Sequence, residues 1–90
     1  MPTREDVKTK VIQLLSIVSS MDIGKIKEES HLKSDLLLAS AMIKALAGPY
    51  TAISKGFGGS MITITEAGKV DTVKSVIDLI WGKIPPSNKQ

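Results

Sequence analysis

The sequence predicts an all-α fold: a small four-helix bundle of three main helices and one short helix, with a long loop after the first helix. Near each end of the chain, apolar residues recur at the spacing of three and four that is typical of an amphipathic helix. A third segment is rich in alanine, which favours helix. The 90 residues are enough for one domain. We place it at residues 1–84 and expect a disordered tail at 85–90.

The first helix is predicted over residues 3–20. Thr3 is a suitable N-cap, and Asp6 at the third helical position complements the helix dipole. The apolar residues that follow lie on one face: Val7, Val11, Leu14, Leu15 and Val18. Residues 21–39 then form a connection with few regular signals, and connections of this length in a small domain tend to be functional.

The second main helix is predicted over residues 40–47. Ser40 is the expected N-cap, and Gly48-Pro49 is expected to end the helix. A short helical turn is expected to follow at residues 50–55.

The C-terminal third is predicted to hold the short helix and the last main helix. Residues 61–65 are β-branched but have no partner strand, so we expect an extended arm that leads into a short helix at 66–69. Asp71 or Thr72 caps the last helix, which Pro85 ends.

Composition excludes several classes of function. The chain has no cysteine and one histidine, His31, so we expect no disulfide and no bound metal. It has no apolar run long enough to span a bilayer and no signal-peptide pattern, so we expect a cytoplasmic protein without a transmembrane segment. The net charge is +3 and three aromatic residues are present, so we expect no nucleic-acid partner, although a basic nucleic-acid-binding helical domain stays open as a third interpretation.

Two segments suggest chemistry from their residues. Residues 56–60, Gly-Phe-Gly-Gly-Ser, resemble a phosphate-binding loop, but no strand precedes them and the Gly-Lys-Ser/Thr ending is missing, so a hinge is the favoured interpretation. Ser40 at a helix N-terminus has its hydroxyl beside unpaired backbone amides, a setting that suits a phosphodiester. The same position also suits a simple capping serine.

The order and spacing of two further stretches resemble the acyl carrier protein family. Residues 62–73, Ile-Thr-Ile-Thr-Glu-Ala-Gly-Lys-Val-Asp-Thr-Val, resemble the family's passage through its short third helix into the last helix. Residues 35–41, Asp-Leu-Leu-Leu-Ala-Ser-Ala, resemble the motif Asp-Leu-Gly-x-Asp-Ser-Leu and place Ser40 on the serine that bears the prosthetic arm. The family's glycine, the acid before the serine and the leucine after it are replaced by Leu37, Ala39 and Ala41.

The resemblance implies a monomeric carrier rather than an enzyme. A 4′-phosphopantetheine arm from coenzyme A would be attached to Ser40 and would hold an acyl group as a thioester, for lipid, fatty acid or polyketide biosynthesis. The implied partners are a phosphopantetheinyl transferase and dedicated acyl-transferring or synthase enzymes, which would contact Asp35, Ala41 and Lys44. The implied lining of the acyl-chain pocket is Val7, Val11, Ile43, Leu46, Ile62, Ile77 and Ile80.

The charge of the second helix departs from the family. The family's second helix is usually acidic, whereas residues 40–55 contain no acid and carry Lys44 and Lys55. This difference implies a dedicated partner instead of the general fatty-acid-synthesis enzymes. It also favours the alternative interpretation, a carrier-like helical module without the arm that acts in protein–protein interaction.

Overall fold

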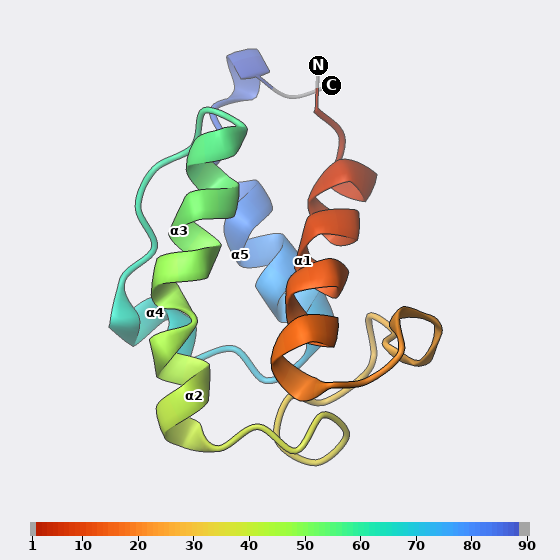
Figure 1. Ribbon diagram of the computed structural model, residues 1–90. Coiled ribbons are helices and arrows are strands. Elements are labelled where there is room, and N and C mark those ends of the chain that lie inside the picture. The colour runs from red at the N-terminus through yellow and green to blue at the C-terminus, as the bar shows by residue number, and fades with distance from the viewer. Residues whose placement is uncertain (1, 89–90) are drawn as a thin grey trace.

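The computed structural model describes residues 2–88, which form a small all-α bundle without a β-strand (Figure 1). The all-α prediction is therefore confirmed. The three longer helices are α1 (Arg4–Ser19), α3 (Ala47–Gly56) and α5 (Val73–Lys83). The shorter ones are α2 (Ser40–Ala45) and α4 (Ile64–Gly68), with 3₁₀ turns η1 (Ile23–Lys25) and η2 (Pro86–Asn88).

The three longer helices surround one core. Helix α1 packs along α5, and α3 contacts both of them, while α2 packs chiefly against α4 (Figure 1). The loop after α1, the beginning of α2 and the beginning of α5 all lie at the same end of the bundle. None of the helices formed by residues 2–88 combines the length and the apolar character needed to cross a membrane.

Helix α1 begins as the sequence predicts. The Thr3 hydroxyl accepts a hydrogen bond from the Asp6 amide at 3.3 Å, and the Asp6 carboxylate accepts one from the Thr3 amide at 2.8 Å. This reciprocal pair satisfies two amides that the helix itself leaves unpaired. The buried face is Val7, Val11, Ile12 and Leu15. Of these, Ile12 was not predicted.

The predicted end of the second helix at Gly48-Pro49 is wrong, because a new helix begins there. The helix is interrupted two residues before Gly48, at Leu46, and α3 starts at Ala47. Pro49 occupies the third position of α3, where the helix needs no amide from it. In one continuous helix its ring would clash with the Ala45 carbonyl, which would also lose its donor. The Tyr50 amide then resumes the ladder with a 2.9 Å bond to the Leu46 carbonyl.

Threonine caps begin the last two helices. Thr63 and Glu66 form a capping box that starts α4 at Ile64, two residues before the predicted position. The arm before it is extended and pairs with no strand among residues 2–88, as expected. Thr72, one of the two predicted caps, accepts a hydrogen bond from the Ser75 amide and begins α5. An ion pair between Glu66 and Lys83 connects α4 to the end of α5.

The end of the chain differs from the predicted disordered tail. Pro86–Asn88 form a 3₁₀ turn, and the Asn88 side chain donates a hydrogen bond to the Phe57 carbonyl at 3.4 Å. The two prolines restrict the backbone here, which favours a defined turn. Residues 89–90, the remainder of the predicted tail, lie outside the described residues.

Candidate functional site

The long loop before Ser40 is fixed to the start of α5 by backbone hydrogen bonds. The Leu32 amide donates to the Asp71 carbonyl at 2.9 Å, and the Val73 amide donates to the Ser30 carbonyl at 3.0 Å. His31 and Thr72 form an isolated antiparallel bridge between these segments. The side chains of Leu32, Leu36 and Leu38 are buried in the core. The loop is therefore a defined support for the helix that follows it.

An ion-pair network adds a second connection between the loop and the bundle. The Arg4 guanidinium bonds the carboxylates of Glu28 in the loop and Asp78 in α5, each at 2.9 Å. Lys8 contacts the other Glu28 oxygen at 3.3 Å. The hydrogen bond from Arg4, with a smaller one from Lys8, lowers the pKa of Glu28. The bonds to Glu28 and Asp78 raise the pKa of Arg4.

A tight turn leads from this loop into α2. The Asp35 carboxylate accepts a hydrogen bond from the His31 amide at 2.7 Å, so this predicted partner-contact residue is exposed but also has a structural role. Leu37 adopts a positive φ of 57°, and 81% of its surface is exposed. Glycine adopts this conformation at the least cost. Leu37 is the residue that the resemblance aligns with a glycine.

Ser40 lies at the start of α2 as its first helical residue. The N-cap is Ala39, so the prediction of Ser40 as the cap is wrong by one position. Ser40 is exposed, and its hydroxyl makes no hydrogen bond with the residues that the structure describes. Ala41 is exposed beside it. The hydroxyl is therefore available to solvent and is not occupied in capping.

Lys44 lies one turn after Ser40 and is exposed. Its aliphatic stem passes over Gly68 of α4, where an added Cβ would lie 3.2 Å from the Lys44 Cγ. Lys44 follows Ser40 by four residues, the spacing that brings two side chains to the same helix face. Ser40 and Lys44 thus lie on the same face of α2, while Asp35 belongs to the turn that precedes the helix.

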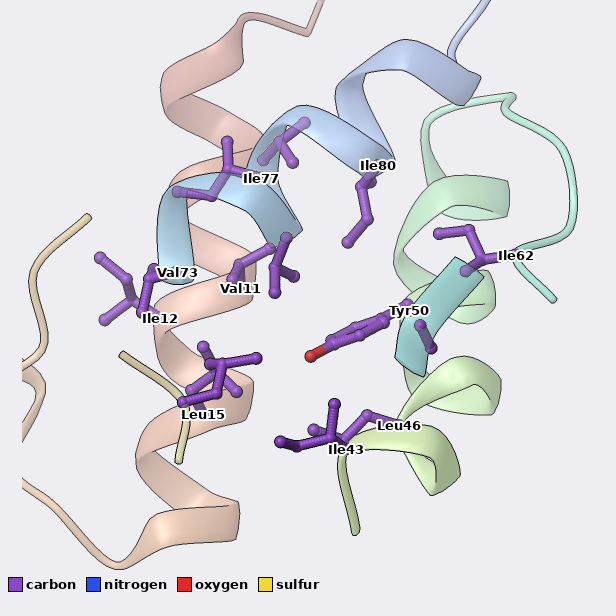
Figure 2. Packing of buried hydrophobic residues seen from close by; sticks show 14 of the residues in the cluster. Val11, Ile12, Leu15, Ile43, Leu46, Tyr50, Ile62, Val73, Ile77 and Ile80 are labelled. Atoms are coloured by element: carbon purple, nitrogen blue, oxygen red, sulfur yellow. The ribbon is translucent and has the colours of Figure 1, made fainter. Parts of the chain in front are cut away.

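The seven residues predicted to line an acyl-chain pocket are all buried in one cluster (Figure 2). They come from α1, α2, the α2–α3 junction, the arm before α4, and α5. In this structure their side chains pack as core. Ile62 also lines an open apolar groove of about 480 Å³ between α3 and residues 61–64. The Ile62 amide donates to the Thr51 hydroxyl at 2.9 Å, which fixes the arm against α3.

Tyr50 is the functional candidate that the sequence analysis did not find. Its side chain is 0% exposed and reaches from α3 toward α1 through the middle of the cluster (Figure 2). Its hydroxyl has no hydrogen-bond partner among the described residues. Burial raises the pKa of Tyr50. The spacing of Ile43, Leu46 and Tyr50 at three and four would have placed this tyrosine on the buried face.

In the glycine-rich loop at residues 56–60, none of the amides of residues 57–60 is free to bind a phosphate. The amides of these four residues all donate to backbone carbonyls of α3 or to that of Lys83. An added Cβ at Gly59 would lie 2.3 Å from the Ser54 Oγ and 3.0 Å from the Lys83 carbonyl oxygen. The loop is a tight turn in which glycine allows close backbone approach.

His31 is exposed, and residues 2–88 contain no group of three acidic or histidine side chains arranged to hold a metal ion.

The arrangement can present a hydroxyl, but it offers that hydroxyl no adjacent base within the helix. Ser40 begins a stretch, residues 40–55, that contains no acid and no histidine. Within this stretch no carboxylate or imidazole is available to activate the Ser40 hydroxyl as a nucleophile. Comparison with known proteins found no family model and no curated protein that matches the chain.

Proposed function

We propose that this protein is a specialised acyl carrier protein, with 4′-phosphopantetheine attached to Ser40. The observation that carries the proposal is the unbonded, exposed Ser40 hydroxyl at the start of α2, at one end of an aliphatic core. The positive φ of Leu37, where the resembling motif has glycine, supports the same alignment. In this interpretation the chain is a monomeric, cytoplasmic carrier and not an enzyme.

The residues around Ser40 fit a phosphodiester. Ala39 and Ala41 leave the hydroxyl unobstructed, and the cation of Lys44 lies one turn along the same helix. An anion on Ser40 would therefore meet favourable charge. When attached, the arm supplies a thiol that holds an acyl group as a thioester. Tethering of this kind raises the effective concentration of the group at the partner's active site.

The rest of the chain positions Ser40 and receives the acyl chain. The loop bonded to α5 holds the beginning of α2 in place, so that the attachment point is presented by a rigid support. Helices α2 and α4 are short and pack on each other. We expect this layer to part when an acyl chain enters, because each short helix buries few residues of its own and so opens at low cost.

The stretch that begins at Ser40 favours an acidic partner. Residues 40–55 carry Lys44 and Lys55 and no acid. The large apolar side chains of Leu37, Met42 and Ile64 are exposed. A transferase or synthase with carboxylates around an apolar patch complements this surface.

Mass spectrometry tests the proposal directly. The protein is incubated with coenzyme A and a broad-specificity phosphopantetheinyl transferase, beside the variants Ser40→Ala and Ser60→Ala. Ser60 is a second exposed serine and serves as the matched control. We expect the mass of one arm to be added to the wild type and to Ser60→Ala, and no addition to Ser40→Ala.

The second candidate is a carrier-like module without the arm, acting through protein–protein contacts. The absence of a carboxylate next to Ser40 in the sequence favours it, since the resembling motif has an acid where Ala39 stands. If no mass is added with the transferase panel, including one from the native host, the armless module replaces the carrier.

A further inference from the structure

We propose that the Tyr50 hydroxyl is an interior hydrogen-bonding site for an oxygen of the carried acyl chain, so that the cargo is an oxoacyl or hydroxyacyl chain and not a fully saturated one. The inference rests on the proposed carrier function for the tether. Its evidence in the structure is two observations of the core: the complete burial of Tyr50 and the lack of a partner for its hydroxyl among the described residues.

A buried hydroxyl without a partner is unfavourable, because it gives up its hydrogen bonds to water and receives none in return. The other fully buried hydroxyl of α3 shows the usual arrangement: Ser54 donates to the Ser60 carbonyl at 2.8 Å. Phenylalanine could fill the volume of Tyr50 without this cost. The phenol oxygen therefore contributes nothing visible to packing, which points to a role in binding.

The position of the hydroxyl suits a guest chain. Figure 2 shows it directed away from α3, toward the aliphatic side chains of Val11 and Leu15 on α1 and of Ile43 on α2. A chain that enters this cluster meets aliphatic groups and one polar atom. A neutral phenol donates to a ketone or a hydroxyl and also accepts from a hydroxyl. Burial raises the pKa of Tyr50 and so keeps the phenol neutral.

The distance from the attachment point makes the site selective. Tyr50 lies ten residues after Ser40 along two consecutive helices. At 1.5 Å per helical residue the two are separated by at most about 15 Å along the helix direction. The hydroxyl is therefore within reach of an acyl chain attached at the serine. An acyl chain is recognised when its oxygen meets the phenol, since an apolar site discriminates weakly and a buried hydrogen-bonding group discriminates strongly.

The absence of cysteine from the chain allows a test that needs no transferase. Ser40→Cys creates one thiol, which is alkylated with iodoacetamide reagents that carry a pantetheine-like linker and an alkyl chain. One reagent is saturated, and the others carry a ketone at successive positions. Each adduct is prepared with Tyr50 and with Tyr50→Phe, and the melting temperature of each is measured.

We expect one ketone position to raise the melting temperature by about 4 to 8 °C more than the saturated chain, the shift that one net hydrogen bond gives in a domain of this size. The difference should vanish in Tyr50→Phe. Equal shifts for the saturated chain and every ketone would overturn the inference, as would a difference that persists in Tyr50→Phe or adducts that leave the melting temperature unchanged. Failure of the transferase to load Ser40 would count against the carrier and not against this site.

Discussion

Replacing Tyr50 by phenylalanine should stabilise the unmodified protein. The side chain is 0% exposed and its hydroxyl has no partner among the described residues, so folding removes that hydroxyl from water without compensation. A buried group left unpaired in this way costs about 1–3 kcal/mol. Phenylalanine keeps the ring and removes the cost. We therefore expect Tyr50→Phe to raise the free energy of unfolding by about 1–3 kcal/mol.

Urea unfolding followed by circular dichroism measures this difference. The matched control is Ser54→Ala on the same helix, because Ser54 is also 0% exposed but its hydroxyl donates to the Ser60 carbonyl at 2.8 Å. Removing that donor leaves the carbonyl unpaired and should lower the free energy of unfolding by about 1–3 kcal/mol. Tyr50→Phe and Ser54→Ala each remove one hydroxyl from α3. The two variants are expected to change the free energy of unfolding in opposite directions.

The sign of the change in unfolding free energy for Tyr50→Phe tests whether the Tyr50 hydroxyl is unpaired. A lower or unchanged free energy of unfolding would show that the phenol has a partner in solution, and the argument for an interior binding site would fail with it. If both variants were destabilised by similar amounts, the contrast between paired and unpaired hydroxyls would be wrong for this core.

Two further predictions concern the turn after α3 and the ion pair between Arg4 and Glu28. Gly59→Ala should lower the free energy of unfolding by about 1–3 kcal/mol, because the new Cβ would press on backbone carbonyls, whereas Gly24→Ala has open space and should change it little; thermal melts of the two variants check this. Because Arg4 lowers the folded-state pKa of Glu28, the contribution of Glu28 is complete above the ordinary value of 4.5 and is lost as the pH falls through the folded-state pKa. In Glu28→Gln the free energy of unfolding should therefore fall less steeply in acid than it does in the wild type, as measured by unfolding across a pH series. In Glu29→Gln it should fall as in the wild type.

The two end helices could be predicted from the sequence because their signals are local. Apolar spacing marks α1 and α5, and Thr3 and Thr72 supply caps whose partners lie three residues away. The break between α2 and α3 could not be predicted with the same rules. Proline ends a helix when it falls in the interior and starts one when it falls in the first turn, and local pattern does not distinguish these cases for Pro49.

The candidate site was predictable in part. The exposed position of Ser40 near a helix start followed from the motif that resembles a carrier. The pairing of Ser30 and Leu32 with residues at the beginning of α5 did not, because it joins segments some forty residues apart and leaves no periodic signal. The isolation of the Tyr50 hydroxyl depends on every side chain around it. No single spacing in the sequence encodes such a property.

Two residues are unfavourable for stability alone: one precedes Ser40 in the chain and the other follows it. Leu37, just before the serine, holds a strained positive φ with its side chain in solvent, and Tyr50 holds an unpaired hydroxyl in the core. Departures from local rules concentrate at functional sites, where the strain serves a contact that the isolated chain does not make. An outer apolar contact at Leu37 serves either a carrier or an armless interaction module. An inner polar contact at Tyr50 serves only a protein that takes a guest into its core. Of the two departures, it is therefore the one at Tyr50 that can test the proposed carrier against the armless module.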